Sequence, residues 1–185
     1  MKYFYLVASL PPVALGEAPP WTPDRFLFHC QGALASEDWR ELALIVEDRA
    51  GEGASDFAAW WHALDTQIRN IQVRFRAARL YLEARPFLRM HDGYDVSAGQ
   101  AATDAMNRTQ PLERELALDR CRWNALDERI LGAPFDLDIV LAYAIRLRLM
   151  ERWDRLSDEK GLQRVESFID DHVNDSLEPE RLGDA

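Results

Sequence analysis

The sequence predicts an all-α protein: a single-domain bundle of about six helices with one long central helix and a short extended N-terminal segment. Apolar residues recur at alternating spacings of four and three between Phe57 and Leu82, which is typical of a helix that packs against other helices. No glycine or proline interrupts the chain from Ala54 to Arg85, so one long helix is expected over this range. A hydrophobic fraction of 48% and six tryptophans in 185 residues predict one sizeable core. We call this apolar stripe of the long helix the seam; it comprises Phe57, Trp61, Leu64, Ile68, Ile71, Phe75, Ala78 and Leu82.

Residues 1–20 are expected to form an extended segment followed by a loop. Tyr3 to Val7 has the aromatic and β-branched composition of a strand, and four prolines follow between Pro11 and Pro20. The first helix is expected to begin with a hydroxyl cap, a proline at the first helical position and an acid near the positive end of the helix dipole, supplied by Thr22, Pro23 and Asp24.

Hydroxyl, acidic or proline residues mark the starts of four further helices at Ser36, Ser55, Pro111 and Asp136. Residues 137–145 are almost all apolar, so this helix is expected to be buried on more than one side. Residues 90–102 lack a pattern and are interpreted as a mobile loop or a short, weakly packed helix. A last amphipathic helix is expected over residues 162–173, and an acidic tail over residues 175–185. The sequence has no internal linker, so the domain is predicted to span residues 1–185.

The net charge of −10 argues against nucleic acid as the partner, because the protein as a whole repels a phosphate backbone. No apolar run approaches the ~20 residues of a membrane span, so no direct membrane insertion is expected and the predicted location is cytoplasmic. Cys30 and Cys121 lie far apart and outside any CxxC motif. They are interpreted as reduced, buried thiols, with a single disulfide left open.

The long helix carries the candidate partner-binding residues. Its second half holds Arg69, Arg74, Arg76 and Arg79 with no acid among them, whereas the preceding helix, from Glu37 to Asp48, is acidic. The favoured interpretation is that the two helices neutralise each other, and the functional alternative is an arginine face that binds an acidic partner helix. Trp60 lies off the seam and is expected either to cover a second contact or to be an exposed docking residue.

Asp119 falls at an apolar position of the helix that begins at Pro111, which makes it the candidate buried polar residue. A carboxylate that faces a core must be paired, or its pKa rises until it becomes neutral. The expected partner is an arginine of the long helix, such as Arg69 or Arg74. The alternative, in which the helix is rotated slightly and Asp119 is solvated, is equally open.

The sequence lacks a recognisable catalytic constellation, so the protein is predicted not to be an enzyme and to need no cofactor. Its four histidines are scattered without the spacing of a metal site. It has neither a Walker A loop, nor a GxGxxG after a strand, nor a nucleophile elbow.

Two stretches resemble a known family. Lys2 to Pro11 resembles the opening of a bacterial family encoded with V-type (archaeal-type) ATP synthase subunits, and Tyr143 to Trp153, followed by Lys160-Gly161, is similar to its closing helices. The family is described as similar to the C subunit of V-type ATP synthase (the d subunit in eukaryotes), a helical, non-catalytic funnel between the central stalk and the membrane rotor ring. This chain is much shorter than a full C subunit, so the resemblance implies a reduced or accessory version.

The resemblance implies a non-catalytic subunit or accessory protein of a V/A-type ATPase that binds other ATPase subunits, which perform ATP hydrolysis and proton translocation. Such a protein would lie peripheral to the membrane through the complex. The alternative is an unrelated cytosolic helical interaction module, with a homodimer on the Phe57–Leu82 seam left open.

Overall fold

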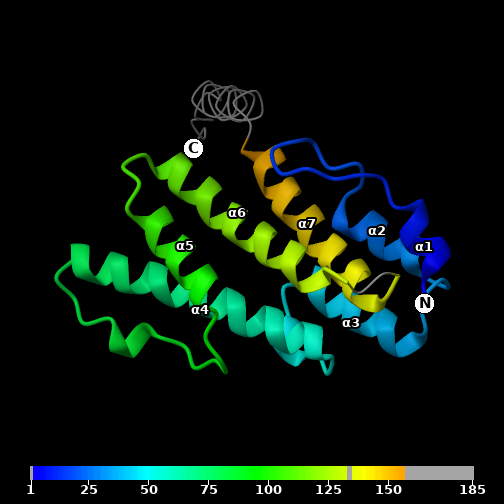
Figure 1. The fold of residues 1–185 in the computed structure, drawn as a ribbon, viewed down its shortest axis with the longest axis horizontal. Helices are drawn as coiled ribbons and strands as arrows, with labels where there is room; N and C mark the ends of the chain where they lie inside the picture. Colours follow the sequence, from blue (N-terminus) through cyan, green and yellow to red (C-terminus); the bar gives the residue numbers. More distant parts are fainter. Residues whose placement is uncertain (1, 133–134, 157–185) are drawn as a thin grey trace, which may run out of the picture.

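The computed structural model describes residues 2–132 and 135–156, and within these ranges the chain forms helices and no strands (Figure 1). The all-α prediction is therefore confirmed. Two 3₁₀ turns, η1 (Ala50–Glu52) and η2 (Arg85–Phe87), flank the longest helix. The helices are α1 (Phe4–Ser9), α2 (Pro23–Cys30), α3 (Ser36–Val46), α4 (Asp56–Arg79), α5 (Val96–Met106), α6 (Pro111–Ile130) and α7 (Leu137–Arg155).

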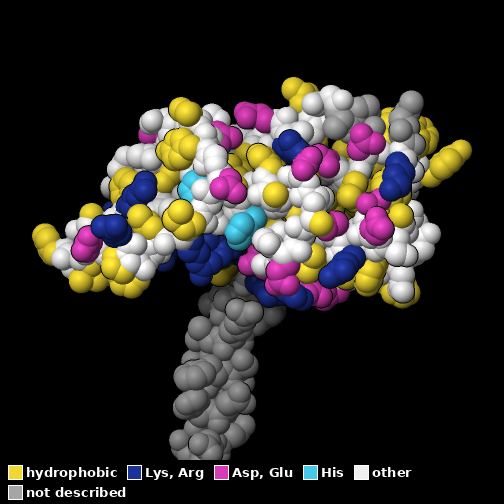
Figure 2. Space-filling view, turned by 90° about the horizontal axis from the view of Figure 1, so that it is seen from below, with side chains coloured by type: hydrophobic (Ala, Val, Ile, Leu, Met, Phe, Trp, Pro, Cys, Tyr) yellow, Lys and Arg dark blue, Asp and Glu magenta, His cyan; other side chains and the backbone are white. Residues whose placement is uncertain are grey.

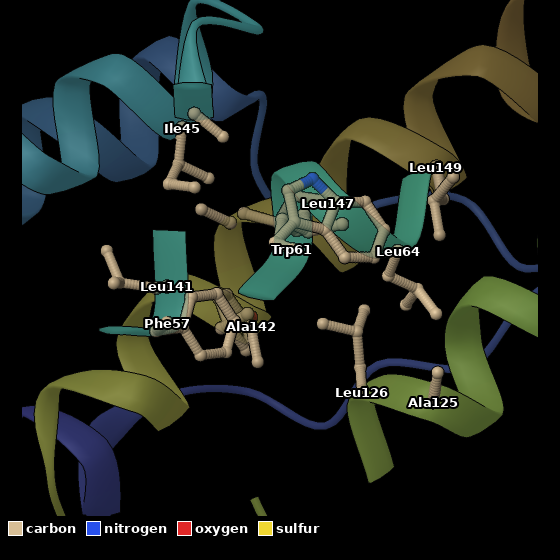
Figure 3. Packing of buried hydrophobic residues seen from close by; sticks show 14 of the residues in the cluster. Ile45, Phe57, Trp61, Leu64, Ala125, Leu126, Leu141, Ala142, Leu147 and Leu149 are labelled. Carbon is tan, nitrogen blue, oxygen red and sulfur yellow. The ribbon is translucent and has the colours of Figure 1, made fainter. Parts of the chain in front are cut away.

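The most enclosed helix is α7. It lies between α6 on one side and α2 and α3 on the other, while α5 fills the space between α6 and α4 (Figure 1). Residues 140–145 are all buried, as expected from their nearly continuous apolar run. Figure 3 shows how Trp61 and Leu64 of α4 lie against Leu126 of α6 in this core. The long helix α4 is thus packed along one side of the bundle.

Helix α4 begins and ends with capping hydrogen bonds. The Ser55 hydroxyl accepts from the Ala58 backbone N–H at 3.1 Å. At the other end, Leu82 N–H donates to the Ala77 carbonyl at 2.9 Å and Tyr81 N–H donates to the Ala78 carbonyl at 3.3 Å, which is a Schellman motif. Tyr81 has a φ of 57°, in the left-handed region. The helix therefore ends at Arg79, and the expectation that it continues to Arg85 is wrong.

The seam is buried inside the chain only over its first five positions, from Phe57 to Ile71. Phe75 is half-buried, and Ala78 and Leu82 are exposed. Neighbouring helices of the same chain cover the buried part, so this surface is not available to a second copy. Near the end of α4, the seam lacks that cover.

The extended N-terminal segment predicted at Tyr3 to Val7 is wrong, because residues 4–9 form helix α1. The described part of the chain offers no strand with which this segment could pair, whereas a helical turn satisfies the backbone, as in the 2.9 Å bond from Val7 N–H to the Tyr3 carbonyl. The Tyr3 side chain is buried, and its hydroxyl donates to the carboxylate of Asp38 on α3.

Of the two interpretations of residues 90–102, the short helix is correct from Val96 onward, but the expectation that it is weakly packed is wrong. Asp95 caps α5 by accepting from the Ala98 N–H at 2.9 Å. The helix then buries small side chains, including those of Ala98, Ala102 and Ala105, against α4 and α6. Small residues let helices approach closely, and a hydropathy pattern does not register them strongly.

The predictions for residues 162–173 and 175–185 lie outside the described residues. Across the ranges that are described, no helix combines the length and the apolar character that crossing a membrane requires.

Candidate functional site

Residues 74–92, at the end of α4 and just after it, form a surface that we call the α4 tip. Five large hydrophobic side chains of this segment are more than half exposed. Five arginines accompany them, against two acidic residues, Glu83 and Asp92. The left end of the molecule in Figure 2 shows hydrophobic and basic side chains side by side. The hydrophobic residues are Leu80, Tyr81, Leu82, Phe87 and Met90, and the arginines are Arg74, Arg76, Arg79, Arg85 and Arg89.

The arginine side chains of the tip form no ion pair with any other residue of ranges 2–132 and 135–156. Arg69, one turn earlier, behaves differently: its Nε lies 2.6 Å from Asp65 Oδ2 and its Nη2 lies 3.4 Å from Asp48 Oδ2. Internal neutralisation by the preceding acidic segment therefore applies to Arg69. Arg74, Arg76 and Arg79 extend beyond its reach.

Two buried amides of α4 hold the chain that returns from the tip. The Asn70 side chain donates to the Arg89 carbonyl at 2.8 Å and accepts from the Arg89 N–H at 2.9 Å. The Gln67 side chain forms the same pair of bonds with Asp95, at 2.7 and 2.8 Å. Both amides are satisfied by backbone groups, as buried polar groups must be. The returning end of the tip is thus fixed to α4.

Trp60 does not belong to this surface. Its ring is half-buried, with the Arg129 guanidinium 5.5 Å from the ring centroid and the Phe57 ring at 5.4 Å. Fourteen residues of helix separate Trp60 from Arg74, which amounts to roughly 20 Å along the axis. Trp60 therefore packs within the chain, in a second contact away from the seam, and is not an exposed docking residue.

A second polar feature is a groove of about 760 Å³ between α4, α6 and α7, which we call the charged groove. Its floor contains Asp119, which is fully buried. Asp119 accepts from Arg122 Nη1 at 3.0 Å, from Arg152 Nη1 at 3.0 Å and from Trp153 Nε1 at 2.9 Å. Arg122 Nε also donates to Asp65 Oδ1 at 2.8 Å. The charged groove is lined by Asp48, Trp61, Asp65, Arg69, Asp119, Arg122, Ile145, Arg148, Leu149, Glu151, Arg152, Arg155 and Leu156.

Asp119 is buried and paired, as its position in the apolar stripe predicts, but the predicted partners are wrong. Neither Arg69 nor Arg74 reaches it; its partners come from its own helix and from α7. Arg122 is three residues along α6, which places both groups on one face, and Arg69 is already held by Asp65. The i,i+3 spacing of Asp119 and Arg122 is the sequence signal that indicates this pair.

The charges of the groove are matched. Burial raises the pKa of the Asp119 carboxyl, while the charges of Arg122 and Arg152 and the hydrogen bond from Trp153 oppose that rise. Asp48 joins two helices, since Arg148 Nη2 lies 2.9 Å from its Oδ1 and Arg69 bonds its other oxygen. Among the described residues, the lining includes no serine, cysteine or histidine. This arrangement is suited to fixing helix positions.

Among the residues that the structure describes, no group of three or more His, Cys, Asp or Glu side chains is arranged to hold a metal ion. The two thiols are free and buried, as predicted: Cys30 lies on α2 and Cys121 on α6. Burial raises the pKa of Cys30 to about 12.

The hydrophobic part of the tip is what sequence reasoning misses. The seam pattern places Leu82 among the buried positions and treats the run from Leu80 to Leu82 as helix, whereas the structure exposes all three residues. A signal for this exists in the sequence: three consecutive large apolar residues shortly before Arg85-Pro86 cannot all face one side of a helix that is about to end.

Comparison with known proteins finds a family that is similar to part of this chain. This family, described as "Protein of unknown function (DUF2764)", is similar to the chain over residues 99–176. The match begins within α5 and includes α6 and α7, hence Asp119 and its partners, while the α4 tip lies outside it. No curated protein and no solved structure matches the chain.

Proposed function

We propose that this protein is a non-catalytic helical subunit or accessory protein of a V/A-type rotary ATPase, and that it binds its partner through the α4 tip. One observation carries the proposal: the tip combines arginines that lack an ion pair within the described chain with exposed aromatic and aliphatic side chains. No other described segment covers these groups.

The composition of the tip matches that of protein–protein interfaces. Tyrosine, phenylalanine, methionine and arginine are enriched at such interfaces, and tyrosine and arginine often dominate the binding energy. An apolar patch bordered by charges on an otherwise acidic protein marks an interaction site. The charged groove is a weaker candidate, because its acids and arginines already neutralise one another.

The choice of a rotary ATPase rests on the family resemblance of residues 2–11 and 143–153. These two stretches meet in the fold, where the Tyr143 hydroxyl donates to the Pro11 carbonyl at 3.1 Å. They belong to the α1–α7 side of the bundle, away from the tip (Figure 1). The resembling part would therefore be the scaffold, and the tip would be the part that contacts another subunit.

The test is affinity purification of the tagged full-length protein from its native host, followed by mass spectrometry. V/A-type ATPase subunits should co-purify with the wild type. They should be lost from a tip variant that combines Arg74→Glu, Arg76→Glu and Arg79→Glu. The matched control changes three exposed arginines elsewhere, Arg25, Arg40 and Arg120, to glutamate.

Absence of every ATPase subunit from the wild-type sample would overturn the assignment to a rotary ATPase. Retention of those subunits by the tip variant would overturn the use of the tip. Loss from the control variant as well would mean that net charge, and not the tip, governs the association.

The alternative function is an unrelated helical interaction module. Homodimerisation on the seam is disfavoured by the burial of Phe57, Trp61, Leu64, Ile68 and Ile71 within one chain. Sedimentation of the wild type and of the tip variant addresses this alternative: a dimer that the arginine changes convert to a monomer would favour it.

A further inference from the structure

We propose that the partner of the α4 tip is an acidic amphipathic helix of another protein, with Tyr81 as the residue that anchors it. This inference rests on the proposed use of the tip as the binding surface, and it names the chemistry of what binds there.

Tyr81 occupies a position that normally belongs to glycine. It is the first residue beyond the cap of α4 and adopts a left-handed conformation with φ 57°. Its side chain is 97% exposed, so in the isolated chain it gains no burial in return for this strain. Strained backbone positions of this kind are concentrated at binding sites. A tyrosine side chain has only two rotatable bonds, so a partner can bury it at little entropic cost.

The charges of the tip point to an acidic partner. Residues 74–92 contain five arginines and two acidic residues and are therefore locally basic, although the whole chain has a net charge of −10. Arg74, Arg76 and Arg79 lie within two turns of α4, and Arg85 and Arg89 lie on the returning segment. Arginine binds carboxylates through two parallel hydrogen bonds, which gives both attraction and orientation.

The mixture of charge and apolar surface points to an amphipathic helix. Leu80, Leu82 and Met90 require an apolar stripe, whereas the arginines require carboxylates beside it. One helix provides both along its length. A membrane or a nucleic acid extends well beyond the tip, and its phosphates would face the acidic remainder of the chain. A single helix contacts the tip alone and avoids that repulsion.

The experiment places a photo-crosslinking residue, benzoylphenylalanine, at position 81 of the full chain in the native host. The control places it at position 5, where Tyr5 is also an exposed tyrosine but lies on α1. Illumination and mass spectrometry then identify the cross-linked segment. We expect position 81, and not position 5, to cross-link to a segment with net negative charge and helical apolar periodicity, with a yield that falls as salt is raised.

Three results would overturn the inference. The first is a cross-link from position 81 to a basic or unpatterned segment, to lipid or nucleic acid, or to this chain itself. The others are no cross-link at position 81 and equal cross-linking at position 5. If the acidic helix belongs to a protein outside the rotary ATPase, the inference stands and the proposed function fails. If ATPase subunits co-purify but position 81 does not cross-link, the proposed function stands and the inference fails.

A second variant separates binding from folding. Tyr81→Gly removes the aromatic and relieves the left-handed strain, so its Tm should stay within about 2 °C of the wild type or rise. Recovery of the co-purifying partner should fall about tenfold or more, while Tyr81→Phe should retain most of it. A Tyr81→Gly protein with a lowered Tm, or with undiminished recovery of the partner, would contradict an anchoring role.

Discussion

The indole Nε1 of Trp153 donates a hydrogen bond to the buried Asp119 Oδ2 at 2.9 Å and thereby joins the end of α7 to the middle of α6. The same carboxylate accepts from Arg122 and Arg152. Burial of a charge is costly unless such donors compensate for it, so these three side chains restrict how α6 and α7 can be positioned.

Replacing Asp119 with leucine should lower the free energy of unfolding by about 3–5 kcal/mol, because the Arg122 guanidinium would remain buried with only Asp65 opposite it. Urea denaturation followed by circular dichroism measures this loss. Arg120→Leu, at an exposed position in the middle of the same helix, is the control and should change stability by less than about 0.5 kcal/mol.

A double variant tests whether the loss comes from the unpaired charge. Asp119→Leu combined with Arg122→Met removes both buried charges and should recover most of the stability. Equal instability of the single and double variants would instead indicate that leucine does not fit the site.

The ion pairs of Asp48 should make stability depend on pH. Burial by itself would raise the pKa of Asp48, but the hydrogen bond and charge of Arg148, together with Arg69, lower it overall. A carboxyl with a lowered folded-state pKa stabilises the fold above its ordinary value of 3.8 and loses that contribution as the pH falls through the folded-state pKa.

Asp48→Asn should therefore reduce stability at pH 7, and the difference from the wild type should shrink below about pH 4. Asparagine tolerates the left-handed φ of this position, 62°, so the backbone is not disturbed. Because the side chain is 49% exposed, solvent screening limits the effect to less than about 1 kcal/mol. Urea titrations at several pH values measure it, and a difference that persists at pH 2 would refute the mechanism.

Gly53→Ala should destabilise the connection between α3 and α4 by about 1–3 kcal/mol. A methyl group at this position would lie 2.6 Å from Ala58 Cβ and 2.7 Å from Glu41 Oε2. Glu41 also accepts from the Ala54 N–H at 2.7 Å, so the methyl group would displace a carboxylate that caps the chain. Thermal unfolding measures the effect, and a Tm equal to that of the wild type would contradict it.

The two thiols should be unreactive in the folded protein. Cys30 has no exposed surface, and burial raises its pKa to about 12, while burial also raises the pKa of Cys121. The thiolate is the reactive form, so a disulfide reagent at pH 8 should modify neither residue quickly. Both should react in urea, and fast labelling of the native protein would show that α2 or α6 opens.

The elements that the sequence predicts correctly are those whose signals are local. The caps at Thr22 and Ser55, the proline at Pro111 and the apolar run of residues 137–145 each depend on a few neighbouring residues, and each appears in the structure as expected. The expectation for Tyr3 to Val7 is wrong, because strand composition reflects a fit to a neighbouring strand and the described chain provides none.

By itself, the sequence determined that the protein is helical, that α4 is long, and that its second half is rich in arginine. Only the tertiary structure decided that Asp119 pairs with Arg122 and Arg152, that Gln67 and Asn70 clamp the returning chain, and that the seam lacks cover near the end of α4. The physical reason is the sequence separation over which each interaction acts. Helix periodicity and capping depend on residues a few positions apart. The partner of a buried charge and the burial of an apolar face depend on which distant helices pack beside them.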